Sequence, residues 1–341
     1  MAYIPSAELV PRVLEGNLRA IARLVSRAES GVDEARAALD EAFRHAGRAH
    51  IVGITGVPGS GKSTLVTALT TAIRRTGRRV AIVAIDPSSP FSGGSILGDR
   101  IRMGEVAGDP GVFVRSMATR GALGGLARGA LEVVDVLDAA GFDVVVIETV
   151  GVGQDEVDIA RAAHTTVVVS APGLGDDIQA IKAGILEVAD IHAVSKCDRP
   201  DANRTIADLK NMLAMGVGPG TRYGVKLKTG EEPKTGTDHV FEWRPPVIAT
   251  SSVRGEGIDE LVSAIDRHYE TLRETGELDA RRTRIAERRM LAAGEDILRA
   301  RFARHRDGRI AELLEGIRTR RISPHTAAMR LLDELHPGDE A

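Results

Sequence analysis

The sequence predicts an α/β fold, in which a mostly parallel central sheet is flanked by helices and extended by further helices at both ends of the chain. Three observations predict it. From His50 onward, short runs rich in Val and Ile alternate with stretches of helical spacing, as in strands joined by helical crossovers. A glycine-rich loop directly follows the first run, and acidic residues close two later runs. These features place a ligand site at the carboxyl end of the sheet.

The composition excludes several classes of protein. The chain has 341 residues, of which 43% are hydrophobic and 27% charged, which is typical of a globular protein. A net charge of −3 argues against a nucleic-acid binder, which normally has a basic face. The single Cys197 excludes a disulfide framework and favours a reducing compartment. With no signal peptide and no apolar run near the roughly 18 residues of a membrane span, we expect a cytoplasmic protein that binds no membrane.

The N-terminal part of the chain shows helical periodicity. Leu14, Leu18, Ile21 and Leu24 with Val25 recur at a spacing that places them on one face of a helix. The sequence from Val32 to His45 is rich in Ala and also predicts a helix. We expect a small helical segment that packs on the main domain.

The C-terminal part is helical and charged. One apolar stripe runs from Ile310 to Ile317, and Ser323-Pro324 opens another helix with Pro at its first position. Such an arm cannot bury two stripes by itself. Dimerisation is the explanation that we favour, and packing back on the core is the alternative. The predicted domains are a helical segment, a nucleotide-binding domain and a dimerisation arm, with the ranges 1–46, 47–275 and 276–341.

The glycine-rich loop fits the P-loop pattern G-x-x-x-x-G-K-[ST] between Gly56 and Ser63. Its glycines let backbone N–H groups turn inward as an anion-binding nest, and the following helix adds its positive end. Lys62 is placed to reach the β- and γ-phosphates, and Ser63 to bind Mg²⁺. The residues expected to contact a nucleoside triphosphate are Gly56, Val57, Pro58, Gly59, Ser60, Gly61, Lys62, Ser63 and Thr64.

Two further strands end in acidic residues, Asp86 and Glu148. Such residues face the ligand crevice of an open α/β sheet. Glu148 can hold Mg²⁺ or its water, and the N–H of Gly151 can approach the γ-phosphate. Gln154 stands where a residue that orients water could lie, and an exposed loop glutamine is the equal alternative.

A base-reading loop is predicted after the apolar run Ile191–Val194. Ser195-Lys196-Cys197-Asp198 has the placement of the guanine-reading motif N-K-x-D. The Asp198 carboxylate can accept both the N1–H and the exocyclic N2–H of guanine, and adenine offers no such pair of donors. The stem of Lys196 can lie along the purine. Because a hydroxyl is shorter than an amide, Ser195 cannot make both contacts of Asn, which weakens base affinity or loop anchoring. Ser251 follows the last strand, where GTPases close over the base.

Taken together, these segments resemble the MeaB/ArgK-type GTPases, the methylmalonyl-CoA mutase-associated chaperones, over residues 10–320. The signatures lie at 56–64, 86–89, 123–125, 148–154 and 175–184. The resemblance implies a homodimeric GTPase that binds GTP and GDP and docks on an adenosylcobalamin-dependent acyl-CoA mutase. There it would gate cofactor loading and exchange inactivated cofactor.

The resemblance also implies roles for single residues. Mg²⁺ would be surrounded by Ser63, Asp86, Asp99 and Glu148. The loops 86–103, 149–158 and 174–188 would be switches, and Lys182 would couple the nucleotide state to the partner. Family members usually have Asn at the position of Ser195.

Three hypotheses follow for the activity. The first is a nucleotide-gated chaperone whose slow GTP hydrolysis rises when the partner mutase binds. The second is a kinase that transfers phosphate to a small molecule or a protein, which a P-loop alone permits. The third is a metal-insertion GTPase, which ranks last because such proteins need clustered Cys or His ligands, and this chain has one Cys and nine scattered His.

Overall fold

A computed structural model describes residues 3–86, 104, 106–118, 129–149, 162–173, 188–216, 243–304 and 309–334. The chain forms two compact units, Met1–Arg281 and Arg282–Ala341. The division falls within helix α12 (Glu277–Arg304). The domain boundaries predicted at 46/47 and 275/276 stay predictions.

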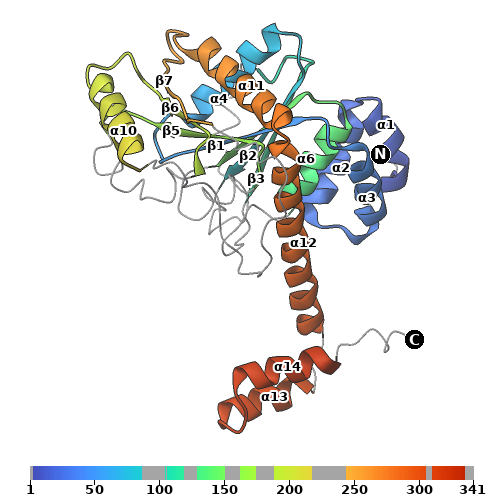
Figure 1. The fold of residues 1–341 in the computed structure, drawn as a ribbon. Helices are drawn as coiled ribbons and strands as arrows, with labels where there is room; N and C mark the ends of the chain where they lie inside the picture. Colours follow the sequence, from blue (N-terminus) through green and yellow to red (C-terminus); the bar gives the residue numbers. More distant parts are fainter. Residues whose placement is uncertain are drawn as a thin grey trace. The chain divides into compact units, whose positions relative to one another are not determined.

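The first unit is built on a seven-stranded sheet in the order β3-β2-β4-β1-β5-β6-β7 (Figure 1). Every strand pair is parallel, so the predicted α/β fold is confirmed. The strands are β1 (His50–Thr55), β2 (Val80–Asp86), β3 (Val112–Ala118), β4 (Val144–Thr149), β5 (Thr165–Ser170), β6 (Ile191–Val194) and β7 (Val247–Ala249).

Strand β1 lies at the centre of the sheet, between β4 and β5. Every residue of β4 and β5 is buried, as expected for strands covered on both faces. Ile54 lies opposite Glu148, and Thr55 lies opposite Val168. The carboxyl ends of three strands therefore meet at the loop that follows β1, which is where ligands bind in open parallel sheets.

Helices cover both faces of the sheet (Figure 1). Helices α4 (Lys62–Arg75) and α11 (Ile258–Glu274) pack on one face with the apolar side chains of β1, β5 and β6. Helix α6 (Ala130–Ala139) packs on the other face. Helix α10 (Ala202–Gly216) lies against β6 and β7.

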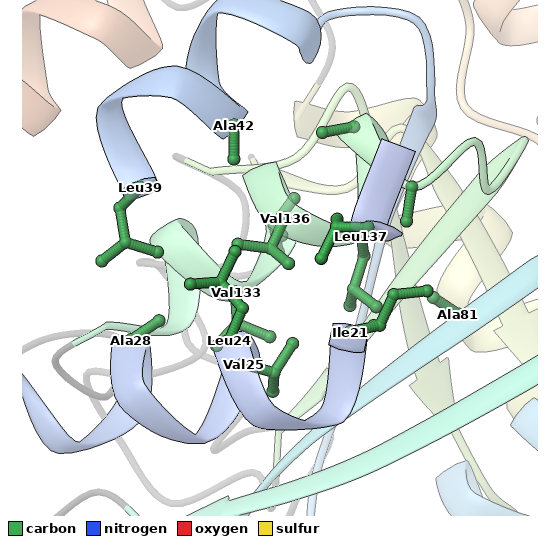
Figure 2. Packing of buried hydrophobic residues seen from close by; sticks show 14 of the residues in the cluster. Ile21, Leu24, Val25, Ala28, Leu39, Ala42, Ala81, Val133, Val136 and Leu137 are labelled. Carbon is green, nitrogen blue, oxygen red and sulfur yellow. The ribbon is translucent and has the colours of Figure 1, made fainter. Parts of the chain in front are cut away.

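The N-terminal helices pack mainly on α6. Figure 2 shows Leu24 and Val25 facing Val133 and Leu137 in this core, and all four side chains are buried. The helical segment thus covers α6 and shares a core with β2 and β4. Its elements are α1 (Ser6–Leu14), α2 (Leu18–Ser30), a 3₁₀ turn (Asp33–Ala35) and α3 (Arg36–His45).

The prediction of one helix face through Leu14, Leu18 and Leu24 is wrong. Helix α1 ends at Leu14 and α2 begins at Leu18, and the side chains of Leu14 and Leu18 are exposed. Gly16 adopts a φ of 77°, and Asn17 caps α2 by accepting a hydrogen bond from the N–H of Ala20 at 3.1 Å. Gly followed by Asn is a helix stop and start signal, and it outweighs the periodicity.

The second unit contains the rest of α12 together with α13 (Arg309–Arg318) and α14 (Pro324–Glu334). Pro324 is the first residue of α14, as predicted. Helices α13 and α14 pack on each other. Large apolar side chains of this unit are nevertheless exposed, namely Met290, Leu291, Ile297, Leu298, Leu314, Met329 and Leu332. Among the described residues, no helix is long and apolar enough to cross a membrane.

Candidate nucleotide-binding site

The P-loop connects β1 to α4 and depends on its glycines. Gly56 has a φ of 139°, and a Cβ there would lie 2.1 Å from the carbonyl oxygen of Val169 in β5. Gly59 and Gly61 have φ values of 78° and 88°, which L side chains rarely adopt. No larger residue would let the loop turn this closely over the sheet.

The first turn of α4 has the features of an anion-binding site. Its N-cap is Gly61, and within the described chain no side chain caps this end and no acidic residue stands in its first turn. The N–H groups of a helix start attract negative charge through hydrogen bonding and the helix dipole. The Lys62 ammonium adds a full positive charge, and it donates hydrogen bonds to the carbonyls of Gly56 at 2.6 Å and Val57 at 3.0 Å.

The predicted magnesium ligands Ser63 and Glu148 lie together. The Ser63 hydroxyl donates a hydrogen bond to Oε1 of Glu148 at 2.7 Å, and both side chains are buried. The register of β1 and β4 produces this contact, because Glu148 pairs with Ile54 at the exit of β1. A hydroxyl and a carboxylate beside the phosphate loop are the hard oxygen donors that Mg²⁺ prefers. These two residues therefore fit a magnesium site.

The base-reading loop is fastened to the P-loop. The Ser195 hydroxyl lies 2.5 Å from the carbonyl oxygen of Ser60 and 3.1 Å from that of Ser170. Lys196, with a φ of 55°, donates to the carbonyl of Gly59 at 2.8 Å. Although Ser195 is shorter than Asn, its hydroxyl reaches the P-loop directly. Loop anchoring, one of the two properties expected to weaken, is thus present in this chain.

Asp198 is held in place by Ser251. The Ser251 hydroxyl donates a hydrogen bond to Oδ1 of Asp198 at 2.7 Å, and this bond is the main cause that lowers the pKa of the carboxyl. The backbone N–H of Cys197 donates to the carbonyl of Thr250 at 3.0 Å. Asp198 is therefore an exposed, ionised acceptor, oriented by the loop that follows β7.

The structure thus unites most of the predicted site. Residues 56–64 and Glu148, Ser195, Lys196, Asp198 and Ser251 surround the carboxyl end of β1, β4 and β6. The backbone of Asp86 lies at the same edge of the sheet, because β2 pairs with β4 up to Ile85 and Thr149. The side chain of Asp86 lies outside the described residues, as do Asp99, Gly151, Gln154 and Lys182 and all of the predicted switch loops except their ends at Thr149 and Val188. Their roles stay predictions.

Sequence reasoning missed the close approach of the loop after β7. Gly257 has a φ of 71°, and a Cβ there would lie 1.9 Å from the carbonyl oxygen of Ala249. The pair of glycines at Gly255 and Gly257 was the available signal. This tight turn, closed by the backbone bonds between Ser251 and Glu256, presents Ser251 to Asp198.

Comparison with known proteins identifies the family. The family model described as methylmalonyl Co-A mutase-associated GTPase MeaB matches residues 18–307. The chain belongs to the MeaB family. It is therefore a P-loop GTPase by family, and the resemblance inferred from its motifs is confirmed.

Two relatives and one solved structure match most of this chain. GTPase ArgK of Escherichia coli is 33% identical over 331 residues, which covers 95% of each chain. The mitochondrial methylmalonic aciduria type A homolog of Caenorhabditis elegans is 34% identical over 284 residues, or 82% of this chain and 67% of that one. A crystal structure of LAO/AO transport system kinase aligns with a TM-score of 0.67 and 26% identity over 98% of both chains.

Proposed function

We propose that this chain is a GTPase chaperone of an adenosylcobalamin-dependent acyl-CoA mutase. It gates loading of the cofactor and exchanges inactivated cofactor, and its slow GTP hydrolysis accelerates when the mutase binds. Two findings support the proposal: the family is described as mutase-associated, and the C. elegans relative is named after methylmalonic aciduria.

The nucleotide assignment rests on the hydrogen bonds between the base-reading loop and the P-loop. Ser195 and Lys196 bind backbone carbonyls of Ser60 and Gly59, so a base at Asp198 and phosphates at Lys62 belong to one ligand. A carboxylate that pairs with two adjacent N–H donors selects guanine over adenine. GTP and GDP are the nucleotides that this arrangement fits.

The residues of the site also indicate how hydrolysis would proceed. Lys62 and the first turn of α4 would stabilise negative charge on the β- and γ-phosphates, and Ser63 and Glu148 would hold Mg²⁺. The bound ion would supply positive charge against the phosphate oxygens. Catalysis would rest on positioning and electrostatics, so we expect slow turnover by the chain alone.

A homodimer is part of the proposal. The second unit exposes apolar side chains such as Met290, Ile297 and Leu314, and a second copy would remove them from water. We place the protein in the cytoplasm, where a single cysteine agrees with reducing conditions.

The test is phosphate release by the full chain with GTP, alone and with each of several purified cobalamin-dependent acyl-CoA mutases. We expect a sharp rise with one mutase and none with the others. The Lys62→Ala variant is the control for contaminating hydrolases. Equal turnover with and without every mutase would remove the chaperone assignment.

The kinase hypothesis is tested with the same protein. The protein in the aligned crystal structure is named a kinase, and that name describes only that protein. GTP labelled on the γ-phosphate, incubated with the chain and a cell extract, should yield labelled inorganic phosphate. Label on a small molecule or a protein would favour the kinase instead.

A further inference from the structure

A second polar cluster lies at the amino end of the sheet, and the nucleotide site does not use it. His50 begins β1, Thr165 begins β5, and Asp190 directly precedes β6. His268 comes from α11 and Arg281 from the start of α12. The first four side chains are buried, and 13% of the Arg281 side chain is exposed.

Asp190 is the centre of this cluster. Its Oδ2 accepts hydrogen bonds from the Thr166 N–H at 2.8 Å and from the Arg281 guanidinium at 2.8 Å. Its Oδ1 lies 3.0 Å from the second Arg281 nitrogen and 3.2 Å from Nε2 of His268. Burial by itself would raise the pKa of Asp190, but Arg281 and His268 outweigh it and lower that pKa well below its usual range. Asp190 is therefore ionised.

The cluster continues from this carboxylate to the first strand. Nε2 of His268 lies 3.2 Å from Oδ1 of Asp190, and its Nδ1 lies 2.9 Å from the Thr165 hydroxyl oxygen. The same Thr165 oxygen lies 2.7 Å from Nε2 of His50. Burial lowers the pKa of His50 well below its ordinary value, so this ring is neutral. A continuous series of polar contacts therefore runs from β1 to α12.

Strand β6 connects this cluster to the guanine site. It has four residues, or roughly 13 Å of extended chain. Asp190 stands directly before it and Ser195 directly after it. Each of these two residues binds one end of β5, Asp190 at Thr166 and Ser195 at Ser170. The same short strand is therefore fixed to β5 beside Asp190 at one end, and at its other end it leads into the loop that carries Asp198.

We propose that Asp190 and Arg281 form a positioning pair for base recognition, which couples the start of helix α12 to the guanine-reading loop through β6. This inference rests on the proposed guanine site and deepens it. Neither residue contacts the nucleotide. They fix the strand whose far end presents Ser195, Lys196 and Asp198, so the geometry of α12 at Arg281 and the affinity for guanine influence each other.

The coupling is measured on the full chain with a fluorescent N-methylanthraniloyl-GDP and Mg²⁺, as the rate of nucleotide release. The variants Arg281→Gln and Asp190→Asn should each accelerate release about fivefold or more, the lower bound of typical coupling between sites. The double variant should release no faster than the faster single variant, because both remove one interaction. Arg281→Lys keeps the charge and loses the planar fork, and it should give an intermediate rate.

A second measurement separates a change in base positioning from a general loss of stability. IDP lacks the exocyclic amino group from which Asp198 would accept a hydrogen bond. The ratio of GDP to IDP affinity therefore reports on that contact. This ratio should fall at least threefold in Arg281→Gln, on the order expected for a weakened hydrogen bond. The matched control is Arg78→Gln, which removes a bidentate ion pair with Asp266 at 2.7 and 3.0 Å without touching β6. It should lower the melting temperature and leave release and the ratio unchanged.

The inference would be overturned if Arg281→Gln and Asp190→Asn only lowered the melting temperature. In that case both variants would release nucleotide at the wild-type rate and keep the wild-type ratio of GDP to IDP affinity. So would equal acceleration by Arg78→Gln. These measurements include no mutase, so failure of the chaperone proposal leaves them intact. If the unaltered chain binds ADP as well as GDP, the guanine assignment itself has failed, and that outcome is distinguishable because it precedes any substitution.

Discussion

The two ends of the sheet carry polar sites that are built in different ways. At the carboxyl end, Lys62, Ser195 and Lys196 bind backbone carbonyls, and the pairs Ser63–Glu148 and Ser251–Asp198 lie beside them. At the amino end, the opposite charges of Asp190 and Arg281 pair with each other, within a cluster that extends to His50. The difference separates the two tasks of the fold. The first end leaves N–H groups and charges for a ligand, whereas the second satisfies its own charges internally.

This comparison predicts how substitutions divide. Changes at the carboxyl end should reduce nucleotide chemistry with little loss of stability, because the groups there serve a ligand. Changes at the amino end should reduce stability first, because each buried group there satisfies another.

The largest expected effect is on catalysis. Lys62→Ala removes the positive charge at the P-loop, and GTP hydrolysis should fall on the order of 10²- to 10³-fold, as for removal of a preorganised charge-stabilising group. The melting temperature of the nucleotide-free protein should change by no more than one or two degrees. Phosphate release and differential scanning fluorimetry on the same preparation check both statements. A large drop in melting temperature would show that Lys62 is needed for the fold.

The difference between the ends also explains what the sequence could predict. The P-loop, the acid after β4 and the base-reading loop are contiguous motifs, in which a few neighbouring residues determine the local geometry. Their positions at strand ends follow from the alternation of strands and helices. The parallel sheet was therefore predictable from the sequence, and so was the convergence of residues 56–64, Glu148, Ser195, Asp198 and Ser251 at one edge of it.

The amino-end cluster was not accessible in this way. His50, His268 and Arg281 are separated by more than a hundred residues or lie on different helices, and only the register of β1, β5 and β6 brings their partners together. Nothing local marks Asp190 as buried. The break between α1 and α2 is a different case, because Gly16-Asn17 marks it in the local sequence. The prediction missed it because the spacing of the apolar residues continues across the break.

A second, smaller effect should appear at the amino end. Thr165→Val keeps the shape of the side chain and removes the hydroxyl that joins His50 to His268. Leaving buried polar atoms without a partner costs about 1–3 kcal/mol. We expect urea unfolding to show this loss, while GTP turnover at low temperature stays within twofold of wild type. Unchanged stability would mean that the hydroxyl does not hold the two rings.

Acid should destabilise the protein through its buried histidines. Burial lowers the pKa of His192 to about 4 and that of His50 well below 6.5, where His164, His268, Arg78 and Asp190 also face His50. In the unfolded chain both histidines take up protons near pH 6.5. Stability is therefore full above pH 6.5 and falls below it, by at most about 1.4 kcal/mol per pH unit for each histidine.

Melting temperatures between pH 8 and pH 5 test this dependence. The curve should be flat above pH 7 and fall progressively below pH 6.5. His192→Leu removes one of the two groups, and its curve should fall less steeply. A melting temperature that is constant down to pH 5 would contradict the assignment of neutral, buried rings.

The smallest effect belongs to an exposed ion pair. Arg75 and Asp259 approach to 2.8 Å between α4 and α11, but both side chains are mostly in solvent. Arg75→Gln should change the free energy of unfolding by less than about 0.5 kcal/mol, since exposed pairs contribute little. Urea unfolding of this variant beside Thr165→Val would show how much the buried position matters. A loss as large as that of Thr165→Val would remove the distinction.

Recognition of guanine by Asp198 at the carboxyl end of the sheet can be tested directly by changing the base. Xanthine carries an oxygen where guanine carries its exocyclic amino group, so an amide at position 198 can donate to it where a carboxylate cannot. Competition between GDP and XDP should strongly favour GDP in the unaltered chain and XDP in Asp198→Asn. Equal preference for the two nucleotides in both proteins would show that Asp198 does not recognise the base.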